Sequence, residues 1–334
     1  MRTRVLVTGT GSFGVGEGIV HCLKMAGDRY ELWAANMDEK ASSLYECEHG
    51  VLLPIASDAE YVQVLRRFSQ EHSIRFLIPG SEPELMAIAP HSESFAAFGC
   101  DVLANPETVV QIGANKYETY KFLKREELPT PESTLDLSES SAQALGWPVI
   151  MKPLSGGGSR NVHKILNAEN LRERREAMQQ LGEQVFLQEY VGAMNEEYTA
   201  SALLDLKGHL IGSFAARRTL SGGATATVEV EDFPDIRSLA ERVARALGAR
   251  GPINIQLRMH HGKPTVFEIN PRFSGSAPFR ALAGFNEPDL MIQSVLLGRP
   301  VELPSRQHGL FGVRSFHESV YSLSAKASLL RPGA

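Results

Sequence analysis

The most specific chemical signal in this sequence is a lysine that precedes a run of glycines. Residues 148–159 read PVIMKPLSGGGS, so an apolar run ends at Lys152 and a glycine-rich segment follows. Glycines allow backbone N–H groups to point at phosphate oxygens, and a lysine beside them supplies a positive charge. In the P-loop pattern the lysine instead follows the glycines. The segment predicts a phosphate-binding loop, with an ordinary hairpin as the alternative. The loop residues are Gly156, Gly157, Gly158 and Ser159.

A second group of polar side chains stands at the end of a predicted strand, residues 265–270. Residues two apart on a strand share a face, so Glu268 and Asn270 would lie side by side. Carboxylate and amide oxygens suit a hard cation such as Mg²⁺, and the guanidinium of Arg272 suits a phosphate oxygen. Gln256, on the preceding predicted strand, adds a third oxygen ligand if the two strands pair. The alternative is a set of ordinary polar residues at a strand end.

Residues 9–14, Gly-Thr-Gly-Ser-Phe-Gly, fit the pattern GxGxxG between a predicted strand and a predicted helix. This context is typical of dinucleotide-binding folds, in which Asp38 would bind a ribose. A tight strand-to-helix turn also favours glycine for its backbone freedom. The pattern leaves three interpretations open: a structural turn, a substrate-binding loop that includes Gly11 and Ser12, or a nicotinamide site.

A further candidate is the stretch from Gln188 to Gly192, which is followed closely by Glu196 and Glu197. A chain that passes between two strands here offers backbone groups to an adenine edge, and a carboxylate to ribose hydroxyls. Taken alone, the acidic residues are better explained as solvated side chains.

The elements that carry these residues fall into two patterns. Over the first hundred residues, strand-like runs alternate with amphipathic helices, which predicts a parallel sheet covered on both faces. Asn105 and Pro106 predict the start of a further helix, with the asparagine as its cap. The predicted strands are 4–8, 30–36, 75–78 and 101–103, and the predicted helices are 15–26, one capped by Asp58, and 83–98.

After residue 114, runs of strands lie beside helices, which predicts an α+β unit. Asn286 is the predicted cap of the last helix. The predicted strands are 147–152, 162–165, 185–191, 198–205, 209–218, 253–259 and 265–270, and the predicted helices are 115–125, 168–181, 236–247 and 287–297.

Composition limits the class of protein. A chain of 334 residues is long enough for about two domains, and its net charge of −5 argues against a general nucleic-acid binder. No apolar run approaches the ~18 residues of a membrane helix, and the first residues lack the apolar core of a secretory signal. The three cysteines are widely spaced, and His260 and His261 fall in a predicted solvated turn, so neither residue type predicts a metal site. We expect a cytoplasmic globular protein that binds neither nucleic acid nor membrane.

In their order and spacing these segments resemble the ATP-grasp superfamily, and within it the carbamoyl-phosphate-synthase-like branch that includes the ligase of pyrrolysine biosynthesis. The resemblance extends from Gly9 to about Gly298. It implies a Rossmann-like α/β N-terminal domain, called the pre-ATP-grasp domain, followed by an α+β ATP-grasp domain of two subdomains. The implied bounds are 1–114 for the first domain, 115–187 and 188–300 for the two subdomains, and 301–334 for a C-terminal extension.

The resemblance also implies roles for individual residues. Lys116 and Lys152 match the two lysines of the family, Glu189 and Val191 its adenine hinge, and Glu197 its ribose-binding acid. The implied ATP-binding residues are Lys116, Lys152, Gly156, Gly157, Gly158, Ser159, Gln188, Glu189, Tyr190, Val191 and Glu197; the metal ligands are Gln256, Glu268 and Asn270; the catalytic residues are Lys152, Arg218 and Arg272. Arg217 is expected on the opposite face of its strand from Arg218.

Two residues depart from the pattern of the family. Asn161 stands where a glycine is common after the loop, and asparagine is the non-glycine residue that best tolerates a positive φ. Gln256 replaces the aspartate that is often seen in related ligases, so a second metal ion is expected to be held less tightly.

The resemblance implies a reaction that uses ATP and Mg²⁺ or Mn²⁺. A substrate carboxylate attacks the γ-phosphate, and an amine then displaces phosphate from the acyl phosphate. The leading hypothesis is a ligase that joins a small-molecule carboxylate, such as an amino acid, to an amine. The alternatives are an ATP-binding protein without ligase activity, a phosphotransferase, and a nicotinamide-dependent oxidoreductase. The predicted substrate residues are Gly11, Ser12, Glu82, Ser274 and Gly275, and a homodimer is left open.

Overall fold

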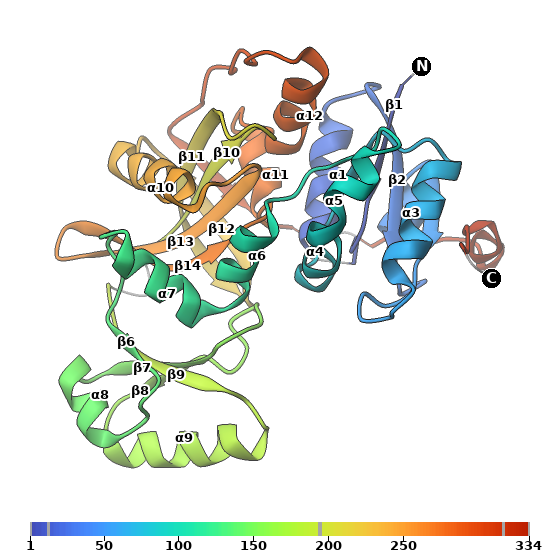
Figure 1. The fold of residues 1–334 in the computed structure, drawn as a ribbon. Coiled ribbons are helices and arrows are strands. Elements are labelled where there is room, and N and C mark those ends of the chain that lie inside the picture. The colour runs from blue at the N-terminus through green and yellow to red at the C-terminus, as the bar shows by residue number, and fades with distance from the viewer. Residues whose placement is uncertain (1, 12–13, 193–195, 316–317, 333–334) are drawn as a thin grey trace.

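A computed structural model gives the fold of residues 2–11, 14–192, 196–315 and 318–332, and these are the residues described below (Figure 1). They form one parallel sheet and two antiparallel sheets. None of the helices among the described residues combines the length and the apolar character that a membrane span requires.

The N-terminal part is a five-stranded parallel sheet with strand order β3-β2-β1-β4-β5. Its central strands are almost fully buried, because helices cover both faces of the sheet. Its strands are β1 (Thr3–Val7), β2 (Tyr30–Asn36), β3 (His49–Leu52), β4 (Phe76–Ile78) and β5 (Asp101–Val102), and its helices are α1 (Val15–Met25), α2 (Ser43–Glu46), α3 (Tyr61–Glu71), α4 (Glu82–Ile88), α5 (Ser92–Ala96) and α6 (Glu107–Ala114). The parallel α/β arrangement predicted from the alternating pattern is confirmed.

The glycine turn that follows β1 packs closely against the start of α4. Gly9 has a φ of +60°, and a Cβ there would lie 2.2 Å from Oε2 of the buried Glu84. The turn lies where β1 has β2 on one side and β4 on the other, which is the point at which ligands bind in open α/β sheets. The glycine at position 9 is therefore a steric requirement of the fold.

Two predicted helix features differ in the structure. The predicted helix 83–98 is broken into α4, a single 3₁₀ turn at Ala89–His91 and α5, because Pro90 has no N–H to donate. Asn105 does not cap α6, whose first turn follows Pro106. Asn286, by contrast, caps α12 as predicted.

The second part is a four-stranded antiparallel sheet with order β6-β9-β7-β8. Two helices, α8 and α9, lie on its outer side (Figure 1). Its strands are β6 (Ser133–Thr134), β7 (Val149–Pro153), β8 (His163–Ile165) and β9 (Val185–Glu189), and the helices are α7 (Lys116–Arg125), α8 (Glu139–Leu145) and α9 (Ala168–Gln180).

The third part is a six-stranded antiparallel sheet with order β14-β13-β10-β11-β12-β15. Its core includes the buried face of α10, and α11 and α12 turn toward the N-terminal sheet (Figure 1). Its strands are β10 (Glu197–Leu204), β11 (Leu210–Ser221), β12 (Ala224–Val230), β13 (Pro252–His260), β14 (Lys263–Asn270) and β15 (Leu310–Val313), and the helices are α10 (Pro234–Leu247), α11 (Ala277–Leu282) and α12 (Glu287–Leu297).

The C-terminal segment connects the third part back to the first. After β15 pairs with β12, the chain crosses to the N-terminal sheet and forms a 3₁₀ turn at Leu323–Ser328. Leu330 then lies beside β3, where its N–H donates to the Gly50 carbonyl at 2.9 Å and its carbonyl accepts from the Leu52 N–H at 2.8 Å. The described part of the C-terminal segment therefore contacts both the five-stranded and the six-stranded sheet.

Asn105 is the side chain that joins the N-terminal part to the six-stranded sheet. It is 1% exposed, and its amide donates to the carbonyls of Pro252 at 2.8 Å and Pro271 at 3.1 Å. Its oxygen accepts from the Arg250 N–H at 3.0 Å. A buried amide with three partners holds the two parts in register.

We expect Asn105→Ala to lower the stability of the whole chain by about 2 kcal/mol or more, because three buried polar groups lose their partner. A melting-temperature decrease of about 4 °C or more should follow. Asn170→Ala is the matched control, since Asn170 accepts one long bond from Leu166 N–H on the surface of α9. Equal melting temperatures for both variants would show that Asn105 does not join the two parts.

Candidate active site

A cavity of about 160 Å³ lies between the four-stranded and the six-stranded sheet. Strands and loops that are distant in the sequence converge on it. Fourteen of the residues singled out in the sequence line this cavity: Lys116, Lys152, Gly156, Gly157, Gly158, Ser159, Gln188, Glu189, Tyr190, Val191, Glu197, Arg218, Gln256 and Glu268. The structure therefore brings the predicted phosphate loop, hinge and polar strand ends to one place.

The glycine loop touches the tip of the β11–β12 hairpin across this cavity. Gly156 and Gly158 have φ values of +92° and +68°, and Asn161 has a φ of +56°, so the asparagine occupies a left-handed conformation. A Cβ at Gly223 would lie 2.2 Å from the Gly158 carbonyl oxygen. The cavity is smaller than the range of about 300–1,000 Å³ that is usual for small-molecule sites.

The side chain of Lys152 extends from the four-stranded sheet to the six-stranded sheet. It is the penultimate residue of β7, is 4% exposed, and its Nζ donates to the Phe267 carbonyl of β14 at 3.2 Å. The ammonium lies 5.4 Å from the ring centre of Phe186 and 5.5 Å from that of Phe267. Burial lowers the pKa of Lys152 to about 8, with Glu268 opposing the shift and Lys116 adding to it. The site thus contains a cation that is largely removed from water.

Lys116 approaches the same cavity from the first turn of α7. Asn115 caps this helix, because its side chain accepts from the N–H of Tyr117 at 2.9 Å. The backbone N–H of Lys116 donates to the Leu154 carbonyl at 2.7 Å, and its Nζ donates to the Gly156 carbonyl. Both contacts fix the lysine to the segment that carries the glycine loop.

Glu197 holds two arginines at the floor of the cavity. Its Oε1 accepts from Nη2 of Arg218 at 2.7 Å, and its Oε2 accepts from Nη2 of Arg258 at 3.0 Å. Both Glu197 and Arg218 are almost fully buried. The resemblance implies that Glu197 binds ribose hydroxyls, and in this structure its two oxygens accept from guanidinium groups. Arg217 points to the opposite face, where it pairs with Glu229, as its position in the strand predicts.

Three oxygen-bearing side chains converge where the C-terminal end of β14, with Glu268 and Asn270, lies beside Gln256 in the middle of β13. The two strands pair with Gln256 opposite Glu268, as the metal hypothesis requires. Oε1 of Glu268 accepts from the amide of Asn270 at 3.1 Å and lies 3.5 Å from Nε2 of Gln256. Nη2 of Arg272 donates to Oδ1 of Asn270 at 3.1 Å, so the arginine is joined to the same group.

This set of oxygens fits Mg²⁺ better than a softer metal. The described residues contain no cluster of three or more His, Cys, Asp and Glu side chains arranged to hold a metal. Mg²⁺ typically takes one or two carboxylates and completes its shell with water and substrate phosphates. One carboxylate and two amide oxygens beside a cationic cavity match that preference.

The charges that line the cavity favour a polyanion. Five cationic side chains and three carboxylates line it, which leaves an excess of two positive charges before any metal is counted. The cations are Lys116, Lys152, Arg160, Arg218 and Arg258, and the carboxylates are Glu189, Glu197 and Glu268. Burial strengthens their interaction with phosphate oxygens, because the local dielectric is low.

Sequence reasoning missed Arg258 and misjudged His260. Both lie on the same face of β13 as Gln256, at i+2 and i+4, so the strand periodicity that singled out Gln256 also predicts them. His260 ends β13 rather than lying in a solvated turn, and its Nε2 is 3.4 Å from Oε1 of Glu189. The β13–β14 hairpin therefore contacts Glu189, which belongs to the predicted adenine hinge.

The predicted substrate residues lie outside this cavity. Ser274 is 2% exposed and its hydroxyl accepts from the Ser276 N–H at 3.0 Å, so it braces a turn and is not open to a ligand. Glu82 begins α4, and its charge acts on Arg272. Gly11 lies next to Asn36, and Ser12 falls outside the described residues. Gly275 accepts a hydrogen bond from Arg314 in a neighbouring region.

Two protein-family models match the chain. The model described as "PylC-like, N-terminal domain" matches residues 5–103. The model described as "ATP-grasp in the biosynthetic pathway with Ter operon" matches residues 182–315. The first match covers the parallel sheet, and the second covers the six-stranded sheet and the segment after it.

Characterised relatives agree with these matches. The large chain of carbamoyl phosphate synthase from Thermomicrobium roseum is 26% identical over 234 residues, which cover 65% of this chain and 21% of that one. The chain thus spans about a fifth of the length of that relative.

Two solved structures share the fold. N5-carboxyaminoimidazole ribonucleotide synthetase from Thermotoga maritima superposes with a TM-score of 0.67 at 17% identity, over 92% of this chain and 79% of that one. L-amino acid ligase from Bacillus licheniformis superposes with a TM-score of 0.67 at 18% identity, over 90% and 75%.

Lys152→Met is expected to stabilise the chain in the absence of ligand at pH 7. Folding at that pH buries a charged ammonium, whereas the methionine variant buries a neutral side chain of similar length. Between pH 8 and 10.5 the folded lysine is neutral while the unfolded one is still protonated, so wild-type stability should rise with pH in this window. The melting-temperature difference between Lys152→Met and wild type should therefore shrink above pH 8.

Lys207→Met serves as the control, because Lys207 lies exposed in the turn between β10 and β11. The same titration of this variant should show no pH-dependent difference from wild type. A destabilised Lys152→Met variant at pH 7 would mean that the ammonium stabilises the fold through its bond to Phe267.

Proposed function

We propose that this chain, whose residues 5–103 match a PylC-like N-terminal domain and whose residues 182–315 match an ATP-grasp model, is an ATP-dependent carboxylate–amine ligase. The observation that carries this proposal is the convergence of the glycine loop, two lysines and the Glu268 group on one cationic cavity. In this proposal the cavity takes ATP, with its phosphates against Lys116, Lys152 and the loop. Structures with this fold include an ADP complex of biotin carboxylase with magnesium and an ATP complex of carboxyaminoimidazole ribonucleotide synthase.

The two sheets position ATP from opposite sides. The hinge after β9 offers backbone groups to the adenine edge at Glu189 and Val191, next to Gln188 and Tyr190. Both oxygens of Glu197 accept from guanidinium groups, which fixes Arg218 and Arg258 at the lining of the cavity. Arg272 is anchored on Asn270 beside the same group.

Mg²⁺ bound by Glu268, Asn270 and Gln256 would neutralise phosphate charge during the transfer. The chain's own contribution is to hold three oxygen-bearing side chains together before the nucleotide arrives, because the amide nitrogens of Gln256 and Asn270 donate to Oε1 of Glu268. Ligands that are already in place need little reorganisation during the reaction.

The proposed reaction has two steps. An oxygen of the substrate carboxylate attacks the γ-phosphorus, the bond to the β-phosphate oxygen breaks, and ADP leaves. The nitrogen of a neutral amine then attacks the acyl carbon, the carbon–oxygen bond to phosphate breaks, and inorganic phosphate leaves while the nitrogen releases a proton to solvent. The protein positions the substrates and neutralises phosphate charge, as is general for phosphoryl transfer.

Phosphate release from ATP with pooled carboxylic acids and hydroxylamine is the direct test. We expect wild-type chain to form an acyl hydroxamate, detected by mass, and to release phosphate at a much lower rate when the acid or hydroxylamine is omitted. Stabilisation by ATP without phosphate release from any acid pool would favour a binding protein of the same fold. Stabilisation by NAD and not by ATP would contradict the proposal altogether.

Glu268→Gln is expected to lower turnover at least about tenfold, a loss of ~1.4 kcal/mol of transition-state stabilisation. The change removes one charge and almost no volume, so the melting temperature should stay near that of wild type. Higher Mg²⁺, or Mn²⁺, which tolerates amide ligands better, should restore part of the activity. Glu229→Gln, at an exposed carboxylate paired with Arg217, is the control. Wild-type turnover of Glu268→Gln across the Mg²⁺ titration would place the metal elsewhere.

A further inference from the structure

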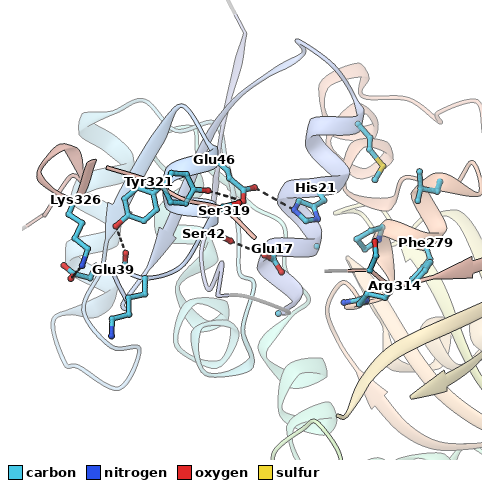
Figure 2. Close-up of a pocket in the computed structure, with 18 of the residues that line it drawn as sticks. Glu17, His21, Glu39, Ser42, Glu46, Phe279, Arg314, Ser319, Tyr321 and Lys326 are labelled. Atoms are coloured by element: carbon cyan, nitrogen blue, oxygen red, sulfur yellow. Dashed lines mark hydrogen bonds and ion pairs between the residues drawn. The ribbon is translucent and has the colours of Figure 1, made fainter. Parts of the chain in front are cut away.

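A buried arginine, Arg280, joins helix α11 to the six-stranded sheet. The outer face of α11 carries Phe279 and Leu282, which line a second cavity of about 610 Å³ between α11, α1 and the C-terminal segment. Phe279 stands beside Arg314 there (Figure 2). The inner face carries Ala277 and Arg280, which are 0% and 1% exposed. Arg280 lines neither this cavity nor the candidate active site, so its charge is directed into the protein interior.

The guanidinium of Arg280 connects α11 to three other elements. Its Nη1 donates to Oε2 of Glu287, the first residue of α12, at 2.9 Å. Its Nη2 donates to Oγ1 of Thr199 in β10 and to Oδ1 of Asn254 in β13, both at 2.7 Å. All four side chains are buried. One side chain therefore fixes α11 to the next helix and to two strands of the sheet.

Asn254, one of the residues that Arg280 holds, stands directly across from a proposed metal ligand. It pairs with Asn270 between β13 and β14. Residues that are paired across antiparallel strands have their side chains on the same face, with Cβ atoms about 5 Å apart. The hydrogen bonds of Arg280 thus end next to the side chain of Asn270.

Arg280 also ties the segment that follows Asn270 back to the same place. The chain leaves β14 at Asn270, passes through Arg272 and enters α11, where Arg280 bonds the Asn254 that pairs with Asn270. Residues 270–280 are thereby held on Asn254 at both ends. Within this segment Arg272 donates to Oδ1 of Asn270, so the orientation of that amide depends on where the segment lies.

Stability alone does not require a buried ion pair at this position. Apolar side chains of similar volume often replace such a pair with no loss of stability. Among the described residues, Nε of Arg280 and Oε1 of Glu287 have no hydrogen-bond partner, so the pair is incompletely satisfied. The contacts that an apolar substitute could not reproduce are those with Asn254 and Thr199.

We infer that Arg280 is a positioning residue for Asn270, which it holds in the geometry that binds a divalent cation together with the nucleotide. It acts through Asn254 and through the segment 270–280. The inference rests on the metal site of the proposed function. Glu287 offsets the charge of the guanidinium, so that Arg280 adds little repulsion toward a cation in that site.

The affinity of the full chain for Mn²⁺ in the presence of ADP tests this role without turnover. Mn²⁺ takes the same kinds of oxygen ligand as Mg²⁺, and electron paramagnetic resonance measures its free concentration. Arg280→Lys keeps a charge opposite Glu287 but lacks the planar fork that reaches Glu287 and Asn254 at once. We expect its Kd for Mn²⁺ to rise about tenfold or more, as is typical when a group that orients a metal ligand is changed. Its melting temperature, and its Kd for ADP without metal, should stay near those of wild type.

Arg280→Met combined with Glu287→Met is the second variant. It removes the ion pair without leaving an unpaired charge in the interior, so folding should survive. It should weaken Mn²⁺ binding at least as much as Arg280→Lys does. Arg217→Lys is the matched control, because Arg217 is exposed on the opposite face of the sheet and pairs with Glu229. Its Kd for Mn²⁺ should equal that of wild type.

Asn270→Ala shows whether Arg280 acts through Asn270. In that background, Arg280→Lys should weaken Mn²⁺ binding much less than about tenfold, because the residue that it positions is already gone. An equal loss in both backgrounds would overturn the inference. A Kd for Mn²⁺ that is unchanged in both Arg280 variants would overturn it as well, and a lowered melting temperature would then show that Arg280 is only structural.

The wild-type chain separates this inference from the proposed function. Wild type that binds no Mn²⁺ in the presence of ADP would refute the metal assignment and the role of Arg280 together. Mn²⁺ binding that weakens in Arg280→Lys, in a chain that forms no hydroxamate with any acid, would support the role of Arg280 and refute the ligase proposal.

Discussion

The arrangement of charges in the candidate site is centred on one buried cation, the ammonium of Lys152, which lies between the two antiparallel sheets. A charge at this depth is expensive to remove from water, and its partners in the protein are a carbonyl of β14 and the field of Glu268. The protein alone compensates the charge of this ammonium poorly, and a bound polyanion would compensate it better. The same feature that costs the unliganded fold stability therefore gives it affinity for phosphate.

The other charges around the site follow from this constraint. Arg218 and Arg258 share one carboxylate, Glu197, which partly offsets the positive charge that Lys152 and the two arginines bring to the cavity. On the opposite side of the cavity, the carboxylate of Glu268 accepts from the side-chain amides of Gln256 and Asn270 and not from a cation. Its charge stays available, which is the condition for binding a hard divalent ion.

The N-terminal sheet and the C-terminal segment complete the molecule around this centre. Asn105 locks the parallel sheet onto the turns at Pro252 and Pro271, the second of which directly follows Asn270. The C-terminal segment returns from β15 to β3 and closes a second cavity against α1. The residues proposed to bind ATP come from the middle of the chain, between Lys116 and Arg272.

The sequence by itself determined the type of each part and singled out the residues proposed to bind phosphate, because both rest on local rules. Strand periodicity placed Glu268 and Asn270 on one face, glycines marked the loop after Lys152, and a positive φ suited Asn161. Tertiary structure decided what depends on contacts between distant segments. Glu197 turned out to bind arginines, Asn105 to bind another domain instead of capping a helix, and Arg314 to line a cavity with α1. No local pattern encodes such partners, since each is set by which surfaces meet when the three sheets pack.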